Sequence, residues 1–148
     1  MYYYILPTDQ DLQHHGVLGM KWGVRKDEAN ANKKVGLLTK ANKKKKKELQ
    51  LKARAYKRSI NWGIGNVEHP SNERLLKRAY RAERRYNKLM KKANKINANL
   101  SLASKEARQK YAIGKNALNN VFGDFNKLNK KHKKTFGSYT RSFMTESV

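Results

Sequence analysis

The sequence has no cysteine, only 11 acidic residues and no long apolar run. Without cysteine the chain can form neither a disulfide framework nor a thiolate zinc site. No apolar stretch approaches the roughly 20 residues that a bilayer-spanning helix needs, so we expect no contact with a membrane. The first residues have no basic start, and their short apolar run leads into Asp9 and Asp11. This order does not fit a secretory signal.

Residues that commonly carry catalysis are few and scattered. The four histidines lie at positions 14, 15, 69 and 132, and no nucleophile-and-base pair can be proposed from the sequence. The adjacent His14 and His15, with Asp9 and Asp11 nearby, could supply part of a metal site, but their spacing matches no metal motif. The glycines do not form a GxxxxGK[ST] phosphate loop. We therefore expect no enzyme, no cofactor and no bound metal.

Positive charge dominates the composition. The 148 residues include 35 Lys+Arg, which gives a net charge of +24, and hydrophobic residues make up only 38%. Ordinary globular domains have roughly 45–50% apolar residues. So basic a chain repels itself when compact unless an anion or a partner surface neutralises it. The composition indicates a single domain with a thin core that depends on a partner.

The N-terminal segment, residues 1–26, differs from the rest. Tyr2–Ile5 is an aromatic run with high strand propensity, and Pro7 ends it. Three glycines, at 16, 19 and 23, then follow within eight positions. Glycine at this density disfavours helix and suits a tight turn, so we predict a short strand followed by a loop.

The remainder is predicted to be mainly α. Residues 27–60 form a Lys-rich helix with Asp27 and Glu28 in its first turn, and residues 61–70 form a linker. Residues 71–134 form a long amphipathic basic helix or helix pair, with Ser71 as N-cap and a possible break near 97–101. Residues 135–148 form a frayed tail.

Two rows of apolar residues define a narrow seam along 71–134. The first row is Ala79, Tyr86, Ala93, Leu100, Ala107, Gly114, Val121 and Leu128. The second is Leu75, Ala82, Leu89, Ile96, Ala103, Tyr111, Leu118 and Phe125. The seam can form a helical hairpin within the chain, or an extended rod that packs against other chains as an oligomer. At about 25 cal/mol per Å² of buried apolar area, so thin a contact barely offsets the entropy of ordering the helices.

Lysine and arginine form two blocks. Residues 33–58 carry twelve of them and a single acid, Glu48, and residues 74–110 carry thirteen more. The run of five lysines at 43–47 would wrap all faces of a helix, and arginine can bind phosphate bidentately. We predict sequence-independent contact with double-stranded DNA, because no base-reading module is visible; a merely solvated face is the alternative. The predicted contacts are Lys43, Lys44, Lys45, Lys46, Lys47, Lys52, Arg54, Lys57, Arg58, Arg78, Arg81, Arg84 and Arg85.

The segment HHGVLGMKWGVR at 14–25 resembles the HHGxxGxKWGxR motif of tailed-phage proteins. That motif accompanies head-morphogenesis, minor capsid and other virion-associated proteins of phages that infect Gram-positive bacteria. The resemblance covers about twelve of the 148 residues. It implies a virion protein that docks on capsid or portal. The matching residues are His14, His15, Gly16, Gly19, Lys21, Trp22, Gly23 and Arg25.

The physical character of this segment fits docking as well. Glycines let a backbone approach another surface closely, and Trp22 is a large anchor of the kind that dominates interface energies. Alternatively, Trp22 folds back on Tyr2–Ile5 and closes a small cap. We expect a multi-copy minor structural protein inside a phage head, found in the host cytoplasm during assembly. The alternatives are a scaffolding or portal-proximal assembly protein that binds acidic capsid surfaces, and a host-directed early protein.

Overall fold

The computed structural model describes residues 22–137, and this part of the chain is almost entirely helical. The mainly α prediction is confirmed. Of the strand and loop predicted for residues 1–26, the part up to residue 21 lies outside the described residues. The elements are α1 (Trp22–Asn61), the 3-10 helix η2 (Pro70–Asn72), α2 (Glu73–Asn94), the 3-10 helix η3 (Leu100–Leu102) and α3 (Lys105–Phe136).

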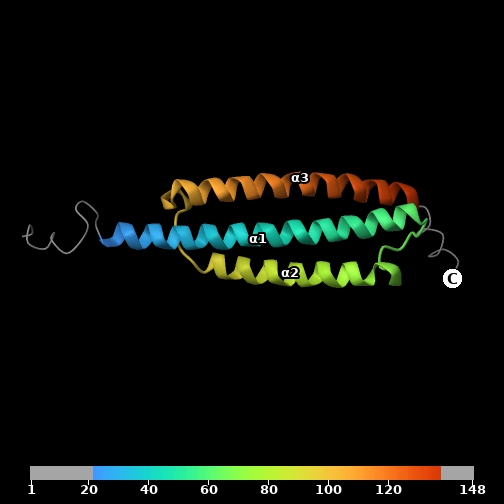
Figure 1. Ribbon diagram of the computed structural model, residues 1–148, viewed down its shortest axis with the longest axis horizontal. Helices are drawn as coiled ribbons and strands as arrows, with labels where there is room; N and C mark the ends of the chain where they lie inside the picture. The colour runs from blue at the N-terminus through green and yellow to red at the C-terminus, as the bar shows by residue number, and fades with distance from the viewer. Residues whose placement is uncertain (1–21, 138–148) are drawn as a thin grey trace, which may run out of the picture.

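The three long helices lie side by side in one elongated layer, with α1 in the middle (Figure 1). α2 runs antiparallel to α1 along one side, and α3 returns along the other side in the direction of α1. α1 packs against both neighbours, whereas α2 and α3 scarcely contact each other. The chain therefore forms a hairpin with a third helix added, as an open layer and not a closed bundle.

The predicted seam faces α1 within the same chain. Every residue of its two rows is buried or half-buried. Ala79, Ala82 and Ala93 on α2 are buried, as are Ala41 and Ala55 on α1, and α1 and α2 pack along each other. Small side chains bring the helix axes close but bury little area each, so the core is thin, as the composition indicates.

The helix begins earlier than the sequence predicts. α1 starts at Trp22, so Gly23 lies inside the helix, and Asp27 and Glu28 lie beyond its first turn. One glycine costs a helix only about 1 kcal/mol relative to alanine, and a 40-residue helix tolerates it. The loop predicted for residues 14–26 therefore does not extend beyond residue 21.

The linker between α1 and α2 is fixed by a buried amide. The side-chain nitrogen of Asn72 donates to the Ser59 hydroxyl (3.0 Å), the Val67 carbonyl (3.0 Å) and the Ala55 carbonyl (3.4 Å). The predicted cap is wrong: Ser71 belongs to η2, and Asn72 precedes α2 without a capping side-chain bond. The amide of Asn72 is used instead to hold α2 against α1.

The connection from α2 to α3 confirms the predicted break in residues 71–134. It returns the chain to the N-terminal half of α1, where the Ser104 amide donates to Asn32 Oδ1 (2.8 Å). Lys34 Nζ donates to the Ala98 carbonyl (3.3 Å), and the Ser104 hydroxyl caps α3 by accepting from the Ala107 amide. These bonds set the register of α3 along α1. Within the described residues, no helix is long and apolar enough to span a membrane.

Candidate nucleic-acid interface

A groove between α1 and α2 is lined by cations from both helices. It consists of two adjoining hollows of about 500 and 180 Å³ that share Lys44, Lys47 and Arg78. No acidic side chain lines either hollow. The lining residues, which define the α1–α2 groove, are Lys43, Lys44, Lys46, Lys47, Gln50, Leu51, Arg54, Arg78, Arg81, Ala82 and Arg85.

Helical spacing brings these charges together. On α2, Arg78, Arg81 and Arg85 are separated by three and four residues, so they share one face. On α1, Lys43, Lys47 and Arg54 are spaced by four and seven and also share a face. Buried alanines hold the two helices close, and the two cationic faces meet at the groove. Eight cations with no acidic residue among the lining create a field that attracts anions.

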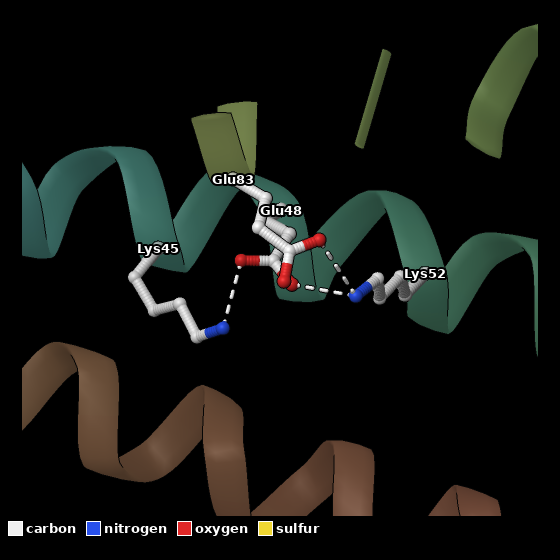
Figure 2. A network of polar contacts seen from close by, with 4 residues as sticks. All are labelled: Lys45, Glu48, Lys52 and Glu83. Atoms are coloured by element: carbon white, nitrogen blue, oxygen red, sulfur yellow. Dashed lines mark hydrogen bonds and ion pairs between the residues drawn. The ribbon is translucent and has the colours of Figure 1, made fainter. Parts of the chain in front are cut away.

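Glu48 removes two of the predicted contacts from this surface. Its carboxylate is 1% exposed and pairs with Lys45 Nζ at 2.8 Å and Lys52 Nζ at 2.7 Å. Figure 2 shows Glu48 between these two lysines, with Glu83 of α2 reaching Lys52 at 3.5 Å. Lys45 and Lys52 are therefore tied to internal carboxylates and do not line the groove.

The same cluster affects the ionisation of Lys52. Partial burial alone would lower the pKa of this amine. The hydrogen bond to Glu48 and the negative charges of Glu48 and Glu83 outweigh burial, so the pKa of Lys52 is raised above its ordinary value. Lys45 and Lys52 also lie over the rings of Tyr86 and Tyr80, at 5.4 and 5.8 Å from the ring centroids.

Three other predicted contacts lie outside the α1–α2 groove. Arg58 donates to the Ser71 carbonyl (3.1 Å) and stacks 5.2 Å from the centroid of the Trp62 ring. Lys57 lines a separate hollow between α1 and α3. Arg84 lies in a shallow cationic hollow on α2 together with Asn87, Lys88, Lys91, Lys92 and Lys95. Eight of the thirteen predicted contacts therefore line the α1–α2 groove, and the other five lie elsewhere.

Two cations of α3 were not among the predicted contacts. Lys127 and Lys131 lie beside Arg54 and Lys57 in the hollow between α1 and α3. Their spacing of four residues is visible in the sequence. Their proximity to α1 depends on the register of two helices some seventy positions apart, and local patterns carry no signal for that register.

Most predicted docking residues lie outside the described part of the chain. These are His14, His15, Gly16, Gly19 and Lys21. The structure describes Trp22, Gly23 and Arg25 only as the first turn of α1. Among the described residues, no three His, Asp or Glu side chains are grouped as metal ligands.

Comparison with known proteins gives one short match. Residues 7–29 are similar to a family of unknown function (DUF7211). No curated protein matches the chain, and no solved structure matches it either. The matched segment overlaps residues 14–25 and ends in α1, so the chain's similarity to this family lies outside the cationic grooves.

Proposed function

We propose that the protein is a minor structural component of a phage virion that lies inside the head and contacts packaged DNA without sequence preference. The observation that carries the DNA contact is the α1–α2 groove, where eight cations from two helices converge with no acid among the lining residues. Such a surface attracts a polyanion through its field.

The groove chemistry suits phosphate groups. Arg78, Arg81 and Arg85 offer planar guanidinium forks that bind phosphate oxygens bidentately. The lysines of α1 add mobile point charges that can follow a backbone. Each contact releases condensed counterions, which supplies affinity that does not depend on base sequence. The groove therefore functions as a phosphate-binding surface.

The contribution of the groove can be measured with a fluorescent random-sequence duplex and the full-length protein. Arg78→Glu/Arg81→Glu reverses two groove charges, and we expect affinity for the duplex to fall about 10–100-fold. Lys88→Glu/Lys92→Glu changes net charge equally on the exposed part of α2 outside the groove. This control should lose less than about 5-fold. Equal losses in both variants would show that the groove has no special role.

The N-terminal segment is proposed to attach the protein to capsid or portal. The support is the resemblance of residues 14–25 to the phage motif and the anchor chemistry of Trp22. Replacing Trp22 and Arg25 with alanine should abolish incorporation into particles and leave duplex binding intact. Mutant particles that retain the protein at normal copy number would refute the docking assignment.

A scaffolding or portal-proximal assembly protein is the second candidate. Exposed apolar side chains favour it, because phosphate contact does not need them and protein interfaces use them. They are Trp62, Tyr80, Leu102, Ile113 and Phe122. Mass spectrometry of purified particles separates the two proposals. A head protein is present in mature, DNA-filled particles, whereas a scaffolding protein is present only in precursors.

A further inference from the structure

A second groove, between α1 and α3, differs in chemistry from the α1–α2 groove. It is a hollow of about 520 Å³. Its apolar residues are Ala53 on α1 and Val121, Phe125 and Leu128 on α3. Polar and charged residues complete the lining, which defines the α1–α3 groove: Gln50, Arg54, Lys57, Asp124, Lys127 and Lys131.

Phe125, the one aromatic residue of the lining, belongs to a cluster of rings. Phe125 packs edge-on against Tyr56, with ring centroids 5.4 Å apart, and Tyr56 packs against His132 at 5.0 Å. His132 in turn contacts Phe136 at 4.8 Å. Phe125 is therefore already held in position before any ligand binds, so a ligand need not order it.

The groove is open because of the helix arrangement. In a closed three-helix bundle each helix packs against the other two, and a third helix covers the groove between any pair. Here α2 lies on the other side of α1 and scarcely contacts α3. A helix of another molecule could take the vacant position beside α1 and α3 and bury Val121, Phe125 and Leu128.

The charges select the partner. Arg54 and Lys57 border the groove on α1, Lys127 and Lys131 border it on α3, and Asp124 is the single acid in the lining. A second copy of this chain carries +24 and would be repelled. DNA would gain nothing from the apolar floor, whereas an acidic helix with one apolar stripe satisfies both floor and borders.

We propose that the α1–α3 groove binds an acidic amphipathic helix of a partner protein. The contact along α3, from Val121 to Lys131, covers about 15 Å at 1.5 Å per residue, so about three turns of the partner helix are engaged. Apolar residues of the partner helix, at spacings of three and four, pack on Phe125 and its apolar neighbours in the groove. Glu or Asp residues on both flanks pair with the lysines of α1 and α3. This protein contact is a separate proposal from the DNA contact, although Gln50 and Arg54 line both grooves.

The test uses the full-length protein and labelled 18-residue synthetic helices. The first peptide has a leucine stripe flanked by glutamates, the second replaces leucine with serine, and the third replaces glutamate with lysine. We expect the Leu/Glu peptide to bind at least about 10-fold more tightly than either other peptide, because both apolar burial and charge contribute. Equal binding of the Ser/Glu peptide would overturn the proposal, since it would reduce the groove to a charged patch.

Variants locate the peptide. Lys127→Glu/Lys131→Glu should weaken the Leu/Glu peptide at least about 10-fold, while Lys88→Glu/Lys92→Glu on α2 should weaken it less than about 3-fold. Equal effects of the two pairs would overturn the site assignment. Measuring duplex and peptide binding for Lys127→Glu/Lys131→Glu and for Arg78→Glu/Arg81→Glu distinguishes the two proposals, because the first pair lines only the α1–α3 groove and the second only the α1–α2 groove. Loss of peptide binding in Arg78→Glu/Arg81→Glu, with peptide binding retained in Lys127→Glu/Lys131→Glu, would likewise contradict the α1–α3 site.

Discussion

Glu48 determines which lysines of α1 are available to an anion. A buried carboxylate needs compensation, because an unpaired charge in a low-dielectric interior is strongly unfavourable. Lys45 and Lys52, three residues before and four after, provide it. Lys44 and Lys47 have no such role in the cluster and line the groove. One acid in a run of lysines thus divides them between structural and surface positions.

Substituting this acid should be costly. We predict that Glu48→Gln lowers the free energy of unfolding by about 1–3 kcal/mol, because two cations lose their buried counter-charge while staying partly hydrated. Urea denaturation followed by circular dichroism measures the loss. Glu73→Gln removes an acid from the exposed Glu73–Lys77 pair and should leave stability almost unchanged. Equal effects of the two substitutions would contradict a structural role for Glu48.

His132 gives the fold a pH dependence. It is 8% exposed among the rings of Tyr56 and Phe136, and burial lowers its pKa below the ordinary 6.5. Its Nε2 has no hydrogen-bond partner within the described residues. The unfolded chain therefore takes up a proton before the folded chain does as pH falls. The stabilising effect of neutral His132 is complete above about pH 6.5 and is lost below it.

We predict that the thermal unfolding midpoint decreases when the pH is lowered from 7.5 to 5. The decrease should be smaller in His132→Phe. Phenylalanine keeps an aromatic ring in the cluster but cannot take up a proton. Thermal unfolding of both proteins in matched buffers measures the difference. If both proteins lost the same number of degrees, titration of His132 would not be the cause.

The helices themselves were largely predictable, because the apolar rows of residues 71–134 recur at helical spacing and every member is buried or half-buried. The second row advances by seven residues up to Ala103 and then by eight to Tyr111, and this longer step spans the start of α3 at Lys105. The start of α1 was not predictable from Gly23, since a long helix absorbs one unfavourable residue. The different roles of Lys45, which pairs with Glu48, and Lys47, which lines the groove, were not predictable either, because they depend on how α2 lies against α1.

Two glycines inside α3 leave it less stable than its length allows. A methyl group added at Gly114 or Gly123 would meet no atom within 4 Å. We predict that Gly114→Ala and Gly123→Ala each raise the free energy of unfolding by about 0.5–1 kcal/mol, because alanine loses less backbone entropy in a helix.

At Gly63, by contrast, replacement by alanine should destabilise the protein, and urea denaturation measures the effects at all three glycines. It follows α1 with a φ of +66°, a conformation unfavourable for residues with a Cβ. Gly63→Ala should lower the free energy of unfolding by about 1–2 kcal/mol. Stabilisation by this substitution would show that the turn after α1 differs from the structure described.

The whole molecule combines a thin core with a high charge. Because α1 lies between two helices that scarcely meet, both of its grooves stay open along the layer. Each groove offers cations, but only the α1–α3 groove adds an apolar floor that contains an aromatic ring, Phe125. The arrangement suits a protein placed between a nucleic acid and a protein partner.

A ligand that neutralises the surface should also stabilise the fold. We predict that saturating duplex raises the thermal unfolding midpoint at low salt, because it binds the folded groove better than the unfolded chain. Differential scanning fluorimetry with and without duplex measures the shift. An unfolding midpoint unaffected by duplex would indicate that the duplex binds the folded groove no better than it binds the unfolded chain.

The dependence of duplex affinity on salt tests the central claim most directly. Fluorescence anisotropy titrations from low to high monovalent salt give the slope of log affinity against log salt concentration. Eight groove cations and about 0.9 ion released per phosphate contact predict a slope of about −4 to −7. In Arg78→Glu/Arg81→Glu the slope should be shallower by about 2. Duplex binding with no salt dependence, or no binding at low salt, would contradict the account.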